Sequence, residues 1–281
     1  MFQIMRTRHV PPSRRQASSR RRVRYKAPAL EKGLDILELL ASVSEALTHS
    51  EIASRLDRTI NEVFRMLVCL EERGYISRTG ADERYQLTLK LFEIVHHHHP
   101  LQRLISLARP LVHQVASETG QSCHLAMLNH AEVVIVAQSD APGNMGFSVR
   151  LGANVNLLNT SSGHVILAFQ NDEVRARALQ SWRLRSRKPV PPGLSSHLNQ
   201  IRRRGYEELA SYLVHGVVNI SYPVLNQHGE AIAAITVPFL ARIGDSAGPP
   251  QVKEALSMAS RELSLAVGGK QLELPSGTAQ S

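Results

Sequence analysis

The sequence predicts an α+β protein with two folded domains, and three observations support this. Its 281 residues, 43% of them hydrophobic, are enough for roughly two domains with a core each. Apolar residues recur at helical spacing between Ala29 and Gly74, and from Gln121 onward the period changes to that of strands. Beyond Gln121, strand-like and helical segments mix over about 150 residues without an internal repeat, which is typical of a sheet covered by helices.

The net charge of +9 is concentrated at the N-terminus. The first 26 residues contain nine of the 33 basic residues and no acidic residue, so the rest of the chain balances 24 basic against 24 acidic residues. The folded body therefore gives no general charge argument for binding nucleic acid. We expect residues 1–26, rich in Pro, Ser and Arg, to be disordered, and a transit peptide is the alternative.

Three helices are predicted at the start of the folded chain. The second and third begin with S/T-x-x-E capping boxes, Thr48 with Glu51 and Thr59 with Glu62. Gly74 is placed to end the third helix. Two capped helices separated by a short turn predict a helix-turn-helix. The residues expected on the apolar face of the first helix are Leu30, Leu34, Leu37, Leu40 and Ala41.

The third helix lies in the run TINEVFRMLVCLEERGY and has two distinct faces. One is apolar and must pack on the domain core; it carries Val63, Met66, Leu67 and Leu70. The other is neither a second apolar stripe nor an ordinary charged surface; it carries Asn61, Phe64, Arg65, Val68 and Cys69. The segments YISRT and ERYQLT then predict a hairpin, so the whole is a winged helix-turn-helix.

A winged helix-turn-helix inserts the second helix of its turn motif into the DNA major groove. There, Asn61 would pair with adenine, Arg65 with guanine or phosphate, and Phe64 would contact a thymine methyl. Positive charges on the hairpin and the N-terminal tail suit the DNA backbone. The complete predicted DNA-contact set is Ser50, Arg58, Thr59, Asn61, Phe64, Arg65, Arg78 and Arg84. The alternative is a structural or dimerising winged helix with Arg65 as a surface arginine.

The connection to the second domain contains four consecutive histidines, His96 to His99. Apolar spacing leads into them from Leu89, and Pro100 is expected to close that helix. Consecutive helical residues project about 100 degrees apart, so at most His96 and His99 would share an ion, with no carboxylate or cysteine nearby. We therefore predict no metal ligand and no cofactor. A further helix follows in LQRLISLARPLVHQVASETG, which Pro110 either kinks or restarts.

The second domain alternates strand-like and helical segments. SCHLAML and EVVIVAQ are strand-like, SSGHVILAFQ and HLNQIRRRGY are helical, GVVNISYPVL and AIAAITVPFL form a hairpin, and QVKEALSMASRELSLAVGG is a closing helix. Ser162 and His164 in NTSSGH invite a hydrolase interpretation, but the G-x-S-x-G elbow is absent. We predict no catalytic residue. The hydroxyls and free amides of this loop suit a carboxylate, and simple capping by Thr160 or Ser161 is the alternative.

The run SEIASRLDRTINEVFRMLVCLEERGYISR, followed by YQLTLKLFEI, resembles the N-terminal domain of the IclR family of bacterial transcriptional regulators. The resemblance extends from about Ala27 to Gly268 and implies a DNA-binding domain at 27–88, a linker helix at 89–109 and a GAF-like effector-binding and oligomerisation domain at 110–270. Tails would occupy residues 1–26 and 271–281. It also implies a palindromic double-stranded DNA operator and assembly as dimers or dimers of dimers. Glu62 departs from the Ser or Thr usual in the family.

The same resemblance implies an effector pocket in the C-terminal domain. VRLGANVNLLNTSSGHVILAF is similar to the family segment that lines it, and GVVNISYPV and AIAAITVPF are similar to its two strands. The implied contacts are Thr160, Ser161, Ser162, Asn219, Thr236 and Pro238. His124 is either a further polar group on the sheet or a core histidine. Pro238 replaces a serine often found in the family, which leaves room for an aromatic acid.

We therefore expect a transcriptional regulator whose operator binding is modulated by a small organic acid. The absence of a long apolar run and the two cysteines, Cys69 and Cys123, without disulfide or metal spacing, fit a cytoplasmic protein with no membrane partner, nucleoid-associated on DNA. One alternative is a hydrolase or other small-molecule enzyme with an N-terminal helical domain that does not bind DNA. Another is an architectural module that binds DNA without sequence preference.

Overall fold

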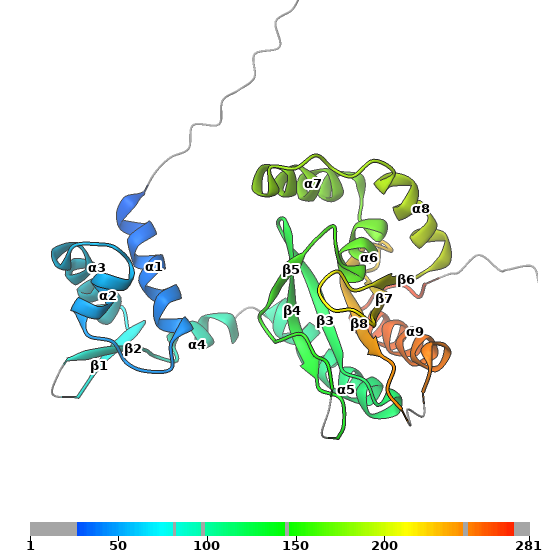
Figure 1. Ribbon diagram of the computed structural model, residues 1–281, viewed down its shortest axis with the longest axis horizontal. Helices are drawn as coiled ribbons and strands as arrows, with labels where there is room; N and C mark the ends of the chain where they lie inside the picture. Colours follow the sequence, from blue (N-terminus) through cyan, green and yellow to red (C-terminus); the bar gives the residue numbers. More distant parts are fainter. Residues whose placement is uncertain (1–26, 81–82, 97–98, 144–145, 244–246, 273–281) are drawn as a thin grey trace, which may run out of the picture. The chain divides into compact units, whose positions relative to one another are not determined.

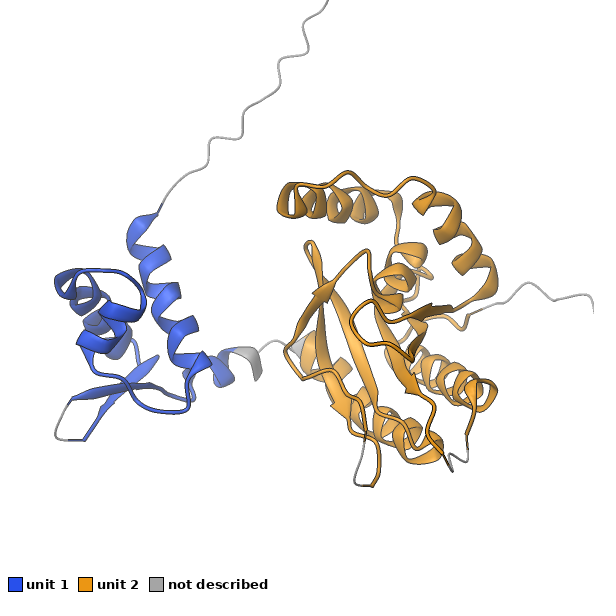
Figure 2. Ribbon diagram, viewed as in Figure 1, with its two compact units in different colours: residues 1–94 blue, residues 95–281 orange. Residues whose placement is uncertain are grey.

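The computed structural model of the protein describes residues 27–80, 83–96, 99–143, 146–243 and 247–272. The chain divides into two compact units, Met1–Ile94 and Val95–Ser281, and Figure 2 shows each in its own colour. The predictions made for residues 1–26, for His97 and His98, and for most of the C-terminal tail lie outside the described residues. No helix among the described ranges has both the length and the apolar composition needed to cross a membrane.

The first unit combines helices with a β-hairpin, as predicted for a winged helix-turn-helix (Figure 1). Its elements are α1 (Pro28–Ser42), α2 (His49–Arg55), α3 (Ile60–Glu72), β1 (Ile76–Thr79), β2 (Arg84–Leu87) and α4 (Lys90–His96). Both capping boxes are confirmed, at the first residues of α2 and α3. The strands β1 and β2 pair antiparallel, and a bridge between Leu47 and Tyr85 joins the hairpin to the helices.

The buried side of α1 differs from the prediction. Ile36 and Leu40 lie in the core of the unit, whereas Leu30 is 63% exposed and Leu34 is 48% exposed. Ala41 is also exposed, so the prediction that Leu30, Leu34 and Ala41 face the core is wrong. Because Ile36 and Leu40 take the core face, Leu34, two residues before Ile36, projects about 200 degrees away around the helix.

The helix after the histidine run also differs from the prediction. α5 (His99–Thr119) begins within the run, and Pro100 lies in its first turn instead of closing the preceding helix. A proline is compatible with a first turn because its missing N–H would have no helical acceptor there. α5 continues through Pro110, so the boundary predicted between residues 109 and 110 falls inside a helix.

The second unit contains a six-stranded antiparallel sheet between two layers of helices (Figure 1). The strand order is β5-β4-β3-β8-β7-β6, with β3 (Cys123–Asn129), β4 (Glu132–Ser139), β5 (Asn154–Asn156), β6 (Glu207–Ala210), β7 (Val217–Leu225) and β8 (Ala231–Leu240). α5 and α9 (Pro249–Ala266) cover one face. α6 (Ser161–Phe169) packs on the other, followed by α7 (Asp172–Ser186) and α8 (Leu194–Arg204).

Each face of this sheet has its own hydrophobic core. Successive residues of a strand point to opposite faces, so Leu125 and Ile220 pack towards α5 and α9, while Ala126 packs towards α6. The same alternation turns Ser221, the residue after Ile220, towards α6. This places a polar side chain in the centre of the α6 face.

Candidate DNA-binding and effector sites

The outward face of α3 carries the three residues predicted to read bases. Asn61, Phe64 and Arg65 are exposed, and 51% of Phe64 is accessible, whereas Val63 and Leu67 of the same helix are buried. The helix is fixed at its start by the Thr59 cap, and its apolar side packs on the core of the unit. The structure therefore brings the three predicted readers together on one surface.

The acidic residue Glu62 is turned back towards the start of α3. Its Oε2 accepts hydrogen bonds from the backbone N and the hydroxyl of Thr59, at 3.2 and 2.9 Å. Its Oε1 accepts from Nζ of Lys32 on α1, at 2.5 Å. The bond from Lys32, followed by those from Thr59, lowers the pKa of Glu62 to about 2. The carboxylate is thus ionised but compensated by a lysine, which reduces its repulsion of a phosphate.

Three of the four arginines in the predicted contact set are paired with carboxylates of the same unit. The pairs are Arg58 with Asp35 (2.5 Å), Arg78 with Glu71 (2.9 Å) and Arg84 with Glu51 (3.2 Å). Partly exposed ion pairs of this kind are weak, so they orient the arginines without blocking a phosphate contact. Arg65 makes no ion pair with the described residues, which leaves its charge available to a partner. Ser50 is exposed in the first turn of α2.

A row of buried polar side chains crosses the sheet beneath α6. The register places His124 opposite Thr236, Thr236 opposite Ser221, and Ser221 opposite Glu207. These four residues, here called the polar row, are at most 4% exposed. Directly opposite residues of paired strands point to the same face, so the whole polar row faces α6.

Hydroxyl groups connect α6 to the middle of the polar row. Ser161 Oγ lies 2.7 Å from Ser221 Oγ, which in turn lies 2.7 Å from Thr236 Oγ1. The two predicted effector residues Ser161 and Thr236 are therefore brought together through Ser221, which the sequence prediction missed. Ser221 could have been predicted from the sequence, because it follows Asn219 by two residues and therefore lies on the same face of the strand.

The neighbouring hydroxyls of α6 have different roles. Thr160 caps the helix, since its Oγ1 accepts from the backbone N of Gly163 at 3.3 Å and donates to the carbonyl of Asn156 at 2.8 Å. With the described residues, Ser162 Oγ has one long contact of 3.4 Å, to Thr160 Oγ1. Gly163 allows the close packing of this turn, because an added Cβ would lie 2.0 Å from the carbonyl oxygen of Leu157.

The structure does not form the serine–histidine pair that suggested a hydrolase. His164 Nε2 lies 2.9 Å from the carbonyl oxygen of Leu158, and its Nδ1 faces Glu207. Ser162 donates a hydrogen bond to Thr160. In the part of the chain that the structure describes, this geometry gives the serine no base and therefore no route to an activated nucleophile.

The remaining predicted effector residues flank the polar row. Asn219 and Pro238 are opposite each other on β7 and β8, one position along the same face from Ser221 and Thr236. Pro238 is buried and Asn219 is partly buried. Burial lowers the pKa of His124 to about 4, so its imidazole is neutral at pH 7.

Glu207 ends the polar row among three nitrogen-bearing side chains. Its Oε2 lies 2.6 Å from His197 Nε2 and 3.5 Å from His164 Nδ1, and its Oε1 lies 2.6 Å from Arg204 Nη2. Burial opposes ionisation of Glu207, but His164, the Glu208 backbone N–H, His197 and Arg204 together lower its pKa. The sequence did not predict this cluster, because the two histidines and the glutamate are far apart along the chain and match no metal-binding motif.

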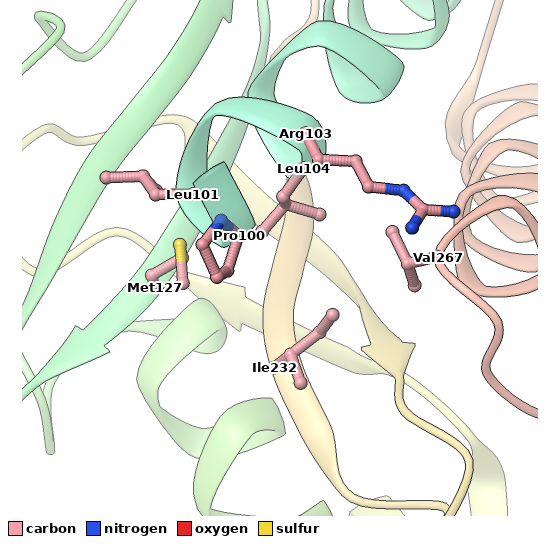
Figure 3. Close-up of a pocket in the computed structure, with 7 residues that line it drawn as sticks. All are labelled: Pro100, Leu101, Arg103, Leu104, Met127, Ile232 and Val267. Carbon is pink, nitrogen blue, oxygen red and sulfur yellow. The ribbon is translucent and has the colours of Figure 1, made fainter. Parts of the chain in front are cut away.

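A pocket of about 530 Å³ lies on the other face of the sheet, between the start of α5 and the end of α9 (Figure 3). Its walls are formed by Pro100, Leu101, Arg103, Leu104, Met127, Ile232 and Val267. The lining is apolar apart from the guanidinium of Arg103. None of these residues belongs to the predicted effector set, so the pocket and the polar row are separate features of the unit.

A winged helix-turn-helix followed in the chain by a sheet domain with a buried polar face is typical of DNA-binding regulators that carry a ligand-binding domain. Comparison with known families agrees. Residues 96–265 match the family described as bacterial transcriptional regulator IclR C-terminal, and residues 29–80 match the IclR helix-turn-helix domain. The chain belongs to the IclR family of bacterial transcriptional regulators, which confirms the resemblance, the fold class and the prediction that the protein is not an enzyme.

Named relatives and solved structures of similar proteins support the assignment to this family. The chain is 32% identical to the HTH-type transcriptional regulator BhcR of Paracoccus denitrificans (strain Pd 1222), over 84% of this chain and 86% of that protein. It is 28% identical to KdgR of Escherichia coli (strain K12), over 74% and 80%. An IclR homolog from Microbacterium hydrocarbonoxydans, solved in complex with 4-hydroxybenzoate, is 25% identical with a TM-score of 0.69, covering 85% of this chain and 98% of its own. Pseudomonas aeruginosa HmgR is 26% identical with a TM-score of 0.67, covering 87% and 100%.

Proposed function

We propose that the protein controls transcription in the cytoplasm by binding a palindromic operator, and that a small aromatic carboxylic acid bound beneath α6 alters this binding. The observation that carries the proposal is the polar row closed by Ser161 of α6. The hydroxyls of Ser161, Ser221 and Thr236 hydrogen-bond to one another, and a polar ligand beneath α6 can take over these bonds, so the row suits a site for such a ligand.

The chemistry of the proposed effector follows from the groups around the row. Amide N–H groups in the first turn of α6 and the weakly bound hydroxyl of Ser162 suit a carboxylate. Thr160, Ser161, Asn219, Thr236 and His124 supply further polar atoms, and Pro238 an apolar wall. The relative solved with 4-hydroxybenzoate supports an aromatic acid.

The DNA contacts are assigned to the outer surface of the first unit. Asn61, Phe64 and Arg65 on α3 would read bases, because this face is exposed and Arg65 has no partner among the described residues. Backbone phosphates would be contacted from the start of α2, from the turn and from the hairpin. The residues assigned to that role are Ser50, Arg58, Thr59, Arg78 and Arg84.

Self-association would provide two such surfaces for the two halves of a palindrome. Exposed apolar side chains on two helices of the first unit support it. They are Leu30 and Leu34 on α1, and Phe92 and Ile94 on α4, with Leu89 just before α4. Either a dimer or a dimer of dimers would bury these side chains.

The effector must bind one arrangement of the two DNA-binding units more tightly than another, because a ligand with equal affinity for both shifts nothing. The hydroxyl link from Ser161 to Ser221 offers a route by which occupation of the site moves α6 relative to the sheet. The proposed response is therefore a population shift between quaternary arrangements.

Selection of sheared genomic DNA by the purified full chain, at about 150 mM salt, tests the proposal. We expect enrichment of a short palindrome, and a change in affinity for that palindrome when aromatic carboxylic acids are added. Folded protein that enriches no common sequence, with or without acids, would contradict the regulator's proposed mode of action. Enrichment without any acid response would contradict only the effector assignment.

A further inference from the structure

Three potential metal ligands converge where α6, α8 and β6 meet. The ligand atoms of His164, His197 and Glu207 all lie within 4.8 Å of one another. Glu207 is 1% exposed, His164 is 7% exposed, and His197 is partly accessible. The three elements belong to one packed unit, so the core around them fixes the position of the cluster.

The backbone partner of His164 sets which nitrogen of its neutral ring faces the cluster. His164 Nε2 lies 2.9 Å from the carbonyl oxygen of Leu158, which can only accept, so Nε2 carries the hydrogen of the neutral ring. Nδ1 therefore presents a lone pair to Glu207 Oε2, 3.5 Å away. Both atoms are buried, and no hydrogen bond of ordinary geometry is formed by either within the described residues, although Oε2 is also 2.6 Å from His197 Nε2. Nδ1 and Oε2 are thus two facing acceptors, an arrangement that a cation bound between them would stabilise.

We propose that His164 Nδ1, His197 Nε2 and Glu207 Oε2 bind a divalent transition metal ion of the Zn²⁺ class. Two imidazole nitrogens and one carboxylate oxygen are a ligand set that zinc accepts in sites with an open fourth position. Ligand atoms of a tetrahedral zinc site lie about 3.3 Å apart, close to the separation between His164 and Glu207. The distance from His197 Nε2 to Glu207 Oε2 is 2.6 Å, shorter than in such a site. Rotation of the His197 side chain, which is 38% exposed, would lengthen it on ion binding.

The surroundings of the cluster fit the outer shell of such a site. A metal-bound histidine usually donates its other ring N–H to a carbonyl or carboxylate, as His164 does to Leu158. Arg204 Nη2 holds Glu207 Oε1 at 2.6 Å, which leaves Oε2 directed at the histidines. Arg204 is therefore a positioning residue for Glu207, and its removal should weaken ion binding.

Three protein ligands leave one coordination position for water or an anion. Glu207 belongs to the polar row with Ser221 and Thr236, so the ion would lie at one end of the surface assigned to the effector. A carboxylate effector would then complete the coordination. This last role rests on the proposed function, whereas ion binding does not.

The test uses metal-free full-length protein in which His96, His97, His98 and His99 are replaced by glutamine, because that run could hold ions by itself. Competition with a chromophoric chelator should show one Zn²⁺ per chain, and Co²⁺ should give the visible absorption of a tetrahedral site. His197→Gln, on the accessible side of the cluster, should weaken binding by at least about 100-fold. His228→Gln, an exposed histidine in the β7–β8 turn, is the matched control and should bind normally.

Failure of the His96 to His99 variant to bind a stoichiometric ion would overturn the proposal, as would unchanged affinity in His197→Gln. The cluster would then be an ion pair with a protonated His164. Operator selection by the metal-free protein is an independent readout, so loss of the metal proposal leaves the regulatory proposal testable.

Discussion

Nζ of Lys32 in α1 lies 2.5 Å from Oε1 of Glu62 in the first turn of α3. This ion pair links the first helix of the DNA-binding unit to its recognition helix. The second oxygen of Glu62 closes the Thr59 capping box. One carboxylate therefore fixes both the start of α3 and its attachment to α1, and the outward face of α3 is held at a defined angle to the rest of the unit.

The pH dependence of folding should reflect this arrangement. The folded-state pKa of Glu62, about 2, is below the ordinary value of 4.5. Its contribution to the free energy of unfolding is therefore complete above pH 4.5 and lost as the pH falls towards about 2. Glu62→Gln should lower the Tm of the first unit near pH 7 and have little effect near the folded pKa. Thermal unfolding of the full chain, with the exposed Glu38→Gln as control, measures this, and a pH-independent difference would contradict it.

Arg65→Ala should weaken operator binding by roughly 10- to 100-fold, the effect of losing about 1–3 kcal/mol from one base-reading arginine. The fold and effector binding should be unchanged, because Arg65 is exposed and makes no ion pair with the described residues. Arg203→Ala removes the same charge from an exposed position on α8 and is the control. Fluorescence anisotropy with labelled operator gives the operator affinity of each variant. An equal loss of affinity in Arg65→Ala and Arg203→Ala would indicate a purely electrostatic effect and contradict a base-reading role for Arg65.

Cys69 provides a chemical probe of the same helix face. It is exposed on α3, one turn after Arg65, whereas Cys123 is buried and burial raises the pKa of its thiol. A thiol-alkylating reagent should therefore modify only Cys69 in the folded protein. Saturating operator should slow this reaction strongly, and DNA of unrelated sequence should slow it less. An alkylation rate insensitive to bound operator would place the DNA on another surface.

Two glycine-to-alanine substitutions should have opposite effects on stability. Gly163→Ala introduces a Cβ 2.0 Å from the Leu157 carbonyl oxygen and should cost about 1–3 kcal/mol through overpacking. Gly33→Ala in α1 meets nothing within 4 Å and should stabilise by about 1 kcal/mol through helix propensity. Urea unfolding of the full chain compares the two, and a stabilised Gly163→Ala would contradict the close approach of α6.

Thr236→Val should leave operator affinity within about twofold and raise the effector concentration needed for a response by roughly tenfold, the effect of about one hydrogen bond. The substitution keeps the side-chain shape but removes the hydroxyl that contacts Ser221. Ser260→Ala, which removes a buried hydrogen bond to β7 from the α9 face, is the matched control. A normal effector response in Thr236→Val would remove this residue from the proposed site.

Features set by neighbouring residues were predicted correctly. The capping boxes at Thr48 and Thr59 depend on a spacing of a few residues, and the structure confirms both. Helical periodicity is less decisive, because one helix can present several overlapping apolar stripes. On α1 the packing selected Ile36 and Leu40, and it left Leu30 exposed.

The centre of the second unit was only partly predictable for a different reason. Thr236 and Ser161 were identified through family resemblance, but their link through Ser221 depends on strand register and helix packing. The cluster around Glu207 requires α6, α8 and β6 to meet, and no local pattern signals such a meeting. Contacts between distant segments therefore had to come from the structure.

The pairing of His124 on β3 with Thr236 on β8 has a consequence for synthesis of the chain. The first unit is built from contacts among neighbouring elements, so it can fold as soon as it leaves the ribosome. The polar row cannot form until β8 has been synthesised, because its members come from both ends of the second unit. A nascent chain therefore acquires its DNA-binding unit well before the part of the protein that we propose responds to a ligand.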